Sequence, residues 1–457
     1  MSNRIGALVI FGASGDLTKR LLLPGLGQLI DSGRSADFRL VGVGQPAMSE
    51  SVWRTRVAKS FEAGGATGVK SRAIAARADY LKADVTNPDD LARIVGSCSG
   101  IPAIYFALPP PVTIAACTAL AKVDLPAGTV FGLEKPFGTD LRSAIALNRQ
   151  LVKLVPEQHI HRVDHFLGKS TVLNLLGLRF ANRILEPVWN AQNIASVDVI
   201  FDEQLALEGR AGYYDRAGAL VDMIQSHLLL VMALIAMEPP SSIDADDLRG
   251  AMAQVVRATG VFGGDPATSS RRARYTAGTV HGRKLPSYAR EPGVDPKNNT
   301  ETLAEVTLAI DNWRWAGVPF TLRSGKALAD TRKEIVVTFR DVPHLPVGLT
   351  GKPGPAALRI SLSPDDIRLD LNINGQGDPF TLDRVVLSTE FAAGELGPYG
   401  EVLSGLLSDD PTLSVRADVI EECWRIVEPV LAAWKQDAVR LESYQAGTAG
   451  PASWPRK

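Results

Sequence analysis

The chain has 457 residues, of which 22% are charged and 45% hydrophobic, and its formal net charge is −1. This length exceeds what one ordinary hydrophobic core holds, so we expect two domains. The near-neutral charge argues against a nucleic-acid or membrane partner, and an anionic substrate would need local Lys and Arg side chains. The three cysteines show no metal-ligand spacing, so we expect reduced thiols in a cytoplasmic protein and no metal site.

Two apolar runs are too short to span a bilayer, which takes about 20 apolar residues. Residues 7–11 lead into a glycine turn and not into a signal-peptide cleavage site. Residues 228–237 end at Glu238-Pro239-Pro240, so we expect a buried core helix there.

The first part of the chain alternates short apolar strands with helical segments. We expect strands at 8–11, 39–43, 103–108 and 129–133, and helices at 17–32, 51–63 and 87–97. Apolar strands separated by helices are typical of a parallel, doubly wound sheet. The sequence therefore predicts an α/β, Rossmann-like dinucleotide-binding domain over residues 1–165.

The second part, residues 166–457, has a different pattern. A helical range at 139–155 ends the first part; helical periodicity then covers 170–185, 215–237 and 417–440, and strand-like runs lie at 195–203, 302–312, 333–342, 356–363 and 366–373. Strands without intervening helices predict an α+β domain with a large, mostly antiparallel sheet. We expect long surface connections over 260–300 and a frayed tail from Ala446.

A glycine-bearing turn, Gly12-Ala13-Ser14-Gly15-Asp16-Leu17, follows the first strand and precedes a helix. Glycines here let backbone N–H groups approach a pyrophosphate at the helix N-terminus. The full G-x-G-x-x-G spacing is absent, and a plain turn capped by Ser14 or Asp16 is the alternative. The strand–helix alternation favours dinucleotide binding, with cofactor contacts from Gly12, Ser14, Gly15, Asp16 and Leu17.

Two further segments combine cations with turn residues. In Glu134-Lys135-Pro136-Phe137-Gly138, Lys135 follows a buried strand, where an ammonium group would face the cofactor crevice; a surface lysine in a turn is equally compatible. Pro136 fits a fixed turn, with a cis bond as one form of it. In the segment 162–169, His165 and Lys169 are four apart and would share a face if helical, which suits a phosphate group.

His227 lies in an otherwise apolar helical pattern, where a histidine is more often a structural core residue. Asp222 and the pair Asp164-His165 add three more polar groups that need partners if buried, and together they favour a site. On an α-helix, Asp222 and His227 would lie about 140° apart, so we expect them to contact different atoms. Downstream, the strand and basic turn at 318–328 offer Arg323 and Lys326 to an anion, with a plain turn as an equal alternative.

These segments, in this order, resemble the glucose-6-phosphate dehydrogenase family over nearly the whole chain. The matching motifs are G-A-S-G-D-L, E-K-P-F-G, R-x-D-H-x-L-G-K, E-G-R-x-G-Y-[FY]-D with D-x-x-Q-x-H, and V-P-F-x-L-R-x-G-K-x-L. The resemblance implies oxidation of glucose 6-phosphate to 6-phosphoglucono-1,5-lactone with NADP, the first step of the oxidative pentose phosphate pathway. It also implies a homo-oligomer, a dimer or tetramer joined through the sheet of the second domain.

The resemblance also assigns roles to individual residues. His227 matches the general base that takes the proton of the C1 hydroxyl, and Asp164 matches its carboxylate partner. The remaining matches are His165 and Lys169 for the substrate phosphate, Glu203 and Asp222 for sugar hydroxyls, Lys326 for the substrate, and Lys135 for substrate and cofactor.

Two positions depart from the family pattern. After the second strand, where NADP-using members carry an Arg, the chain has Gln45 and no acidic residue, so NAD remains possible and Arg54 or Arg56 could serve instead. Five residues after Lys326, where some relatives carry a cation, the chain has Thr331, followed by Arg332 and Lys333. An NAD-preferring enzyme or one for another hexose phosphate is the first alternative. A silent regulatory homologue is remote, because His227 and Asp164 are both present.

Overall fold

The computed structural model describes residues 5–375, 377–391 and 394–455. The chain forms two compact units. The first unit comprises Met1–Ser170, Pro240–Ala251 and Gly394–Glu421, and the second comprises Thr171–Pro239, Met252–Ala393 and Glu422–Lys457. These units differ from the two continuous ranges expected, 1–165 and 166–457, because two later segments return to the first unit. The functional division between those ranges stays a prediction.

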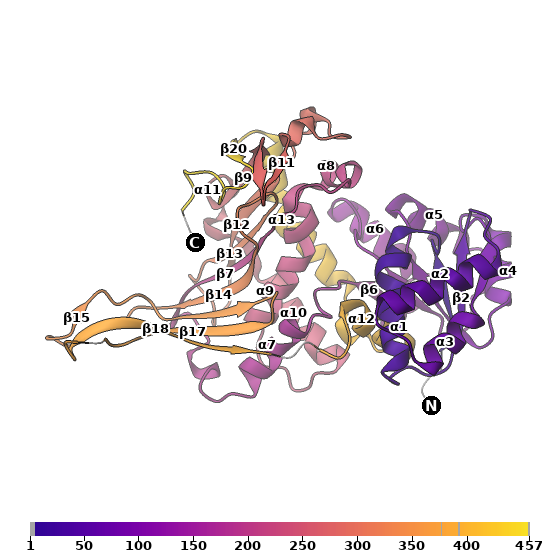
Figure 1. The fold of residues 1–457 in the computed structure, drawn as a ribbon, viewed down its shortest axis with the longest axis horizontal. Coiled ribbons are helices and arrows are strands. Elements are labelled where there is room, and N and C mark those ends of the chain that lie inside the picture. The colour runs from indigo at the N-terminus through magenta and orange to yellow at the C-terminus, as the bar shows by residue number, and fades with distance from the viewer. Residues whose placement is uncertain (1–4, 376, 392–393, 456–457) are drawn as a thin grey trace. The chain divides into compact units, whose positions relative to one another are not determined.

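The first unit is built on a seven-stranded sheet in the order β19-β6-β5-β4-β1-β2-β3, in which every neighbouring pair except β19 and β6 is parallel (Figure 1). This sheet confirms the predicted doubly wound α/β class. The bounds are β1 (Ile5–Phe11), β2 (Arg39–Gly44), β3 (Asp79–Lys82), β4 (Ile101–Phe106), β5 (Val130–Leu133), β6 (Ile160–Val163) and β19 (Ser414–Val415). Strands β3, β6 and β19 were not predicted from the sequence.

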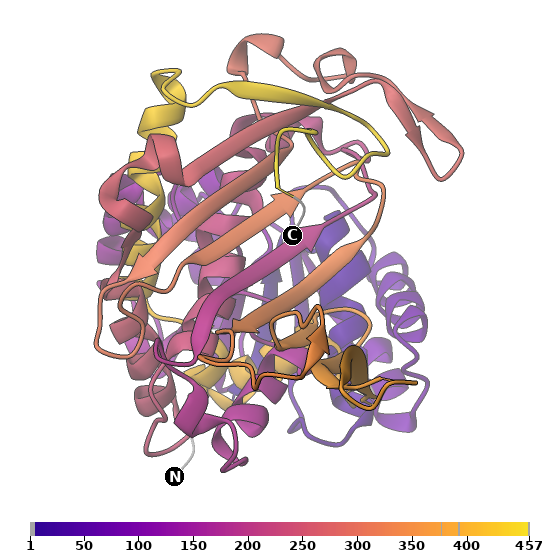
Figure 2. The same cartoon turned by 90° about the vertical axis from the view of Figure 1, so that its left-hand side faces the viewer.

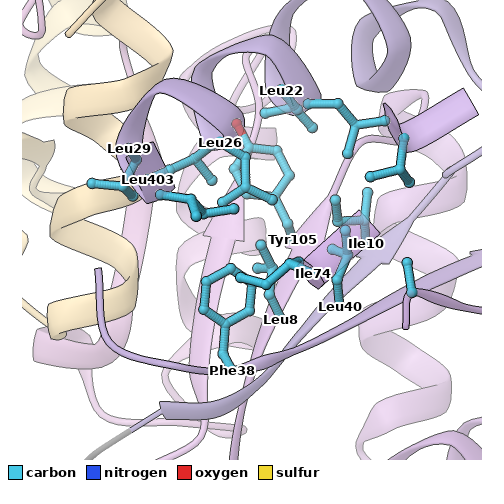
Figure 3. Packing of buried hydrophobic residues seen from close by; sticks show 14 of the residues in the cluster. Leu8, Ile10, Leu22, Leu26, Leu29, Phe38, Leu40, Ile74, Tyr105 and Leu403 are labelled. Carbon is cyan, nitrogen blue, oxygen red and sulfur yellow. The ribbon is translucent and has the colours of Figure 1, made fainter. Parts of the chain in front are cut away.

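Helices cover this sheet, and their apolar faces bury its core. They are η1 (Thr18–Leu22), α1 (Leu23–Asp31), α2 (Glu50–Ala63), α3 (Val69–Ala76), α4 (Pro88–Gly96), α5 (Pro110–Leu120) and α6 (Leu141–Leu151). Leu8 and Ile10 alternate onto one face of β1, where Leu22 and Leu26 pack against them with no exposed surface (Figure 3). Full burial of each such side chain contributes about 1.5–3 kcal/mol.

A late segment returns to this unit as helix α12 (Pro398–Ser408). Leu403 of α12 lies beside Leu26 and Leu29 of α1 (Figure 3). A Cβ atom on Gly25 would lie 2.8 Å from the backbone nitrogen of Gly400, so the glycine allows the two helices to approach closely. The glycine-rich sequence of α12 gives a weak helical signal because glycine disfavours helix, and tertiary packing outweighs that preference.

The same returning segment is fixed to β6 by a buried arginine. Arg162 has no exposed surface and donates to both carboxylate oxygens of Glu157, at 2.7 and 3.0 Å, and to Asn148 at 3.0 Å. Glu157 also accepts a hydrogen bond from the backbone of Ala417 at 3.0 Å. This network pairs the Arg162 charge, which its burial requires, while β19 adds an antiparallel strand beside β6.

The second unit holds an eleven-stranded sheet, which Figure 2 shows face on. Its order is β15-β18-β17-β16-β14-β7-β13-β12-β9-β20, with β8 paired to β12. Most neighbours are antiparallel, as predicted; the parallel pairs are β7–β13, β9–β20 and β15–β18. The bounds are β7 (Ile194–Asp202), β8 (Thr259–Val261), β9 (Ser270–Thr276), β12 (Leu303–Ile310), β13 (Phe320–Gly325), β14 (Arg332–Phe339), β15 (Thr350–Gly351), β16 (Ala357–Ser361), β17 (Asp366–Asn374), β18 (Thr381–Glu390) and β20 (Leu441–Gln445).

One long apolar helical run supports this sheet, formed by α8 (Ala211–Ala219), η4 (Leu220–Leu228) and α9 (Leu229–Ala236). By length and composition it could cross a membrane, but 89% of its most apolar window is buried within the protein. The indole N–H groups of Trp189 and Trp315 donate to the carbonyls of Ile235 and Ala236, at 2.8 and 2.7 Å, and so satisfy the buried helix end. The run is therefore the core helix that the sequence predicted. Helices α7 (Ser170–Phe180), α10 (Ala245–Arg257) and α13 (Ala417–Lys435) each contain residues of both units.

Two expectations about irregular segments were wrong. The range 260–300 contains β9 and the hairpin β10 (Gly278–Val280) and β11 (Arg283–Leu285). Its arginine-rich composition resembled a loop, but Arg272 is buried and its guanidinium donates to the backbone of Val439 at 2.9 Å. The tail after Ala446 is packed as well: Gly447 donates to the backbone of Ala327 at 2.9 Å, and Trp454 is buried.

Candidate functional site

The predicted dinucleotide loop lies at the carboxyl end of β1. The backbone N–H groups of Gly12 and Ala13 both donate to the carbonyl of Val43, at 3.0 Å, which holds the loop across the ends of β1 and β2. Gly12 has φ +82°, and a Cβ there would lie 2.1 Å from the carbonyl oxygen of Ala107, so only glycine fits. Ser14 and Leu17 are half-buried and Gly15 and Asp16 are exposed. This geometry leaves backbone groups at a strand end and suits a pyrophosphate.

Lys135 and Asp164 follow two neighbouring parallel strands, β5 and β6. These strands pair with Leu133 opposite Arg162, so the two residues lie at adjacent strand ends. The Lys135–Pro136 bond is cis, the form of turn considered for this proline. Asp164 is 1% exposed and accepts a hydrogen bond from the backbone of Phe166 at 3.0 Å.

The segment after Asp164 is a tight turn and not a helix. Leu167 donates to the carbonyl of Asp164 at 3.0 Å, and α7 begins only at Ser170. His165 and Lys169 therefore do not share a helical face. They are instead connected through Phe166: the Lys169 ammonium lies 4.1 Å from its ring centroid and the His165 ring lies 5.2 Å from it, edge-on.

A buried carboxyl group, Glu134, stands beside these residues and had no role assigned from the sequence. Tyr105 donates to its carboxylate at 2.5 Å. Burial raises the pKa of Glu134 to about 7, and hydrogen bonds from Tyr105 and Tyr399 only partly oppose this rise. Tyr399, from the returning α12, stacks on the His165 ring with centroids 5.8 Å apart. An acidic residue directly after a buried strand was the only available signal.

In the second unit, Glu203, Lys326 and Lys333 meet at the ends of β7, β13 and β14. Glu203 accepts from Lys326 at 2.9 Å and from Lys333 at 3.2 Å. Burial acts to raise the pKa of Glu203, but the two ammonium groups outweigh it and hold the pKa below its ordinary value. Thr331 donates to Gln204, and Arg332 donates to Glu334. Of these three consecutive residues, Lys333 is therefore the one whose cation approaches Glu203, the carboxylate predicted to bind the substrate.

Asp222 and His227 lie within η4, which is a π-helix and not an α-helix. In a π-helix the hydrogen bonds join residues five apart, so these two side chains project from the same side of the segment. The expected separation of about 140° assumed α-helical geometry and was wrong. Both residues are buried, with 9% and 6% of their surface exposed, and η4 packs against β12 and β13.

A glycine and a buried glutamate mark the start of η4. Gly218, at the end of α8, has φ +64°, and a Cβ there would lie 2.2 Å from a carboxylate oxygen of Glu301. Glu301 accepts from the backbone N–H of Leu220 at 2.9 Å and so caps the start of η4. Burial raises the pKa of Glu301 to about 7.

Among the described residues, no group of three or more His, Cys, Asp or Glu side chains could hold a metal ion. Four of the eight residues predicted for catalysis and substrate binding belong to the first unit, namely Lys135, Asp164, His165 and Lys169. The other four belong to the second, namely Glu203, Asp222, His227 and Lys326. A dinucleotide loop on a parallel sheet, with a separate unit that presents a buried histidine and a carboxylate held by two lysines, defines a two-unit NAD(P)-dependent dehydrogenase.

Comparison with known proteins identifies the family. The model of the glucose-6-phosphate dehydrogenase NAD binding domain matches residues 9–174, and that of the C-terminal domain matches 176–456. The chain belongs to the glucose-6-phosphate dehydrogenase family and is an oxidoreductase with the activity of that family.

Full-length relatives agree with this assignment. Glucose-6-phosphate 1-dehydrogenase of Gluconobacter oxydans (strain 621H) is 36% identical over 97% of this chain and 94% of its own length. The enzyme of Mycolicibacterium smegmatis is 37% identical with the same coverage. The crystal structure of the Mycobacterium avium enzyme superposes with a TM-score of 0.86 at 35% identity, covering 98% of this chain and 96% of that one. A glucose-6-phosphate dehydrogenase in complex with its substrate gives 0.89 at 28% identity, covering 99% and 97%.

The raised pKa of Glu134 predicts a specific pH dependence of stability. In the unfolded chain this carboxyl loses its proton near pH 4.5, but in the folded protein only near pH 7, so stability falls as pH rises through that window. Glu134→Gln has no proton to lose and should flatten this fall, by on the order of 3 kcal/mol between pH 5 and pH 8. The thermal midpoint of both proteins across that range measures the effect. Exposed Glu62→Gln is the matched control, and equal pH slopes in the wild type and Glu134→Gln would contradict the prediction.

Proposed function

We propose that His227 is the general base of glucose 6-phosphate oxidation, taking the proton of the C1 hydroxyl, and that Asp164 is its carboxylate partner. The observation that carries this assignment is the π-helical turn, which fixes a buried imidazole and the Asp222 carboxylate on one side of η4. A positioned imidazole can take a proton from a reacting hydroxyl, and a separate carboxylate can accept hydrogen bonds from other hydroxyls of the sugar. The bound nicotinamide supplies the hydride acceptor, and 6-phosphoglucono-1,5-lactone is the product.

The phosphate of the substrate is assigned to His165 and Lys169. Both contact Phe166, so the imidazole and the ammonium group belong to one rigid turn. Lys135, at the neighbouring strand end, is the proposed contact to both substrate and cofactor. The sugar hydroxyls are assigned to Glu203 and Asp222, with Lys326 and Lys333 as the cations of the second unit.

Replacement of the proposed base should abolish turnover without removing substrate affinity. We expect His227→Asn to lower kcat by about 100-fold or more, because general-base catalysis typically contributes 10²–10⁴-fold. The dissociation constant for glucose 6-phosphate, measured by calorimetry, should change less than about threefold, since the base contributes chiefly to the transition state. Exposed His281→Asn is the control. A His227→Asn enzyme with near-wild-type kcat would show that another group is the base.

In this proposal Lys333 provides the positive charge at the substrate site that some relatives carry at the position of Thr331. Lys333→Ala should raise KM for glucose 6-phosphate by about 10-fold with a smaller change in kcat, since hydrogen bonds to charged groups contribute about 1.5–3 kcal/mol. Steady-state kinetics with saturating cofactor measures this, with exposed Lys352→Ala as the control. An unchanged KM would place Lys333 outside the substrate site.

NADP is the proposed cofactor, in a cytoplasmic enzyme. The family requires an NAD(P)-binding domain, which the loop at Gly12 and the parallel sheet provide. The neutral residues Gly44 and Gln45 at the end of β2 present no carboxylate to a ribose 2′-hydroxyl, the group that typically selects NAD.

We propose that the chain is a homo-oligomer joined through the second sheet. The inner apolar face of that sheet runs through Ile335, Ile360 and Leu358, which are buried. The same face continues, through the register of β16, β17 and β18, to Leu369 and Leu387, and Leu387 is 56% exposed. These strands extend beyond the helices of their unit (Figure 1), so the apolar side chains at their far ends are not covered by those helices. An exposed apolar strip of this kind favours a second copy of the chain as its partner.

Light scattering coupled to size exclusion tests this proposal on the full chain. We expect a dimer or tetramer for the wild type. Leu387→Asp should shift it toward a smaller species, because a carboxylate would have to be buried in the apolar contact. Lys352 is exposed and directly follows β15 of the same sheet, so Lys352→Asp is the control that should leave the oligomer intact. A monomeric wild type, or an unaltered oligomer in Leu387→Asp, would contradict the proposal.

A further inference from the structure

The end of β2 lacks the residue that normally discriminates between NAD and NADP. Gly44 ends this strand, and a Cβ there would lie 2.7 Å from the Tyr80 hydroxyl and 3.3 Å from Oγ of Ser14. Gln45 follows with an exposed, uncharged side chain. The charge that would recognise a 2′-phosphate must therefore come from another element.

Helix α2 supplies a cation at this position. Arg56 extends from α2 to the dinucleotide loop, where its Nη1 donates to the carbonyl oxygen of Ser14 at 2.7 Å. Its positive charge also acts on Tyr80. Burial raises the pKa of the Tyr80 hydroxyl, and the charge of Arg56 partly opposes this rise. The guanidinium is thus half-buried beside Ser14, with one of its several N–H donors used.

Arg54, the other candidate on α2, is occupied elsewhere. Its Nη2 donates to Glu50 at 2.7 Å and its Nε donates to the carbonyl of Ala78 at 3.1 Å. Four further arginines of the first unit also pair with carboxylates: Arg20 with Asp16, Arg39 with Asp79, Arg77 with Asp37 and Arg93 with Asp90. In the part of the chain that the structure describes, no carboxylate forms an ion pair with Arg56. Its positive charge is therefore not neutralised by the protein.

The carboxylate of Asp84, which follows β3, is engaged within its own loop. Oδ1 of Asp84 accepts from the backbone and the hydroxyl of Thr86, at 2.9 and 2.7 Å, so this carboxylate is turned into its own loop. The Tyr80 hydroxyl donates to the carbonyl of Pro46 at 2.8 Å, so the donors left beside Ser14 for a phosphate oxygen are the Ser14 hydroxyl and the Arg56 guanidinium.

We propose that Arg56 binds the 2′-phosphate of NADP and is the residue of this chain that selects NADP over NAD. The proposal rests on the NADP assignment above and adds the group that makes the selection. A planar guanidinium anchored through one N–H to the Ser14 carbonyl keeps its remaining donors oriented for a phosphate, which a lysine at the same position would not reproduce.

The test is binding to the full chain, measured by isothermal titration calorimetry with four probes: NADP+, NAD+, adenosine 2′,5′-bisphosphate and AMP. For Arg56→Ala we expect about 10- to 100-fold weaker binding of NADP+ and of adenosine 2′,5′-bisphosphate, because a charge-assisted contact is lost. Binding of NAD+ and AMP, which have no 2′-phosphate, should change less than about threefold. Arg56→Lys should fall between the wild type and Arg56→Ala, and Arg54→Ala is the matched control from the same helix.

Each result has a distinct meaning. Arg56 could instead serve only to fix α2 to the loop; Arg56→Ala would then weaken all four probes equally and lower the thermal midpoint, and the proposal would be overturned. If Arg56→Ala does not fold, Arg56→Lys still reports, because retained wild-type preference for NADP+ in that variant would exclude a role for the guanidinium geometry. A wild type that binds NAD+ as tightly as NADP+ would overturn the cofactor assignment itself. If the wild type prefers NADP+ and Arg56→Ala keeps the same preference, only the role of Arg56 is overturned.

Discussion

Parallel pairing of β1, β2, β4, β5 and β6 is the constraint on which the first unit depends. Parallel strands end at the same edge of a sheet, so the residues that follow these strands lie in one row along that edge. This pairing brings together the Gly12 loop, Gly44, Glu134 with Lys135, and Asp164. Because the strands are buried, their register is fixed, and a slip by one residue would send the apolar side chains to the wrong face.

The second unit gathers its polar groups by a related device. Strand β7 lies between a parallel neighbour, β13, and an antiparallel one, β14, so the end of β7 meets the end of one strand and the start of the other. Glu203, Lys326 and Lys333 occupy those three positions. A carboxylate shared between two ammonium groups stays ionised despite its burial, because the Coulomb attraction outweighs desolvation. The charges are in place before any sugar arrives, which reduces the reorganisation that binding requires.

Much of this arrangement was readable from the sequence, and the failures have definite physical causes. The alternation of apolar strands and helices predicted the first sheet, whereas the helical face expected for His165 and Lys169 was wrong because the segment after Asp164 is a turn. Helix α12 was not predicted because its glycines are typical of a loop. Gly400 of this helix instead allows a close contact with Gly25 of α1, which only the tertiary structure reveals. The side shared by Asp222 and His227 escaped because a π-helix has no sequence period of its own. Glu134 escaped because its partners, Tyr105 and Tyr399, lie far away in the chain.

The return of residues 394–421 to the first unit has a consequence for how the protein is made. Strand β19 and helix α12 complete the first sheet and cover α1, and they leave the ribosome only after almost all of the second unit has been synthesised. At typical translation rates of about 5–20 residues per second, the nascent first unit waits on the order of tens of seconds with Leu26 and Leu29 uncovered. A gene fragment ending near residue 170 would carry the whole predicted dinucleotide loop yet lack Tyr399, Leu403 and strand β19, which pairs with β6. The nucleotide-binding half is therefore contiguous in space but not in the gene, so it cannot be excised as a simple cassette.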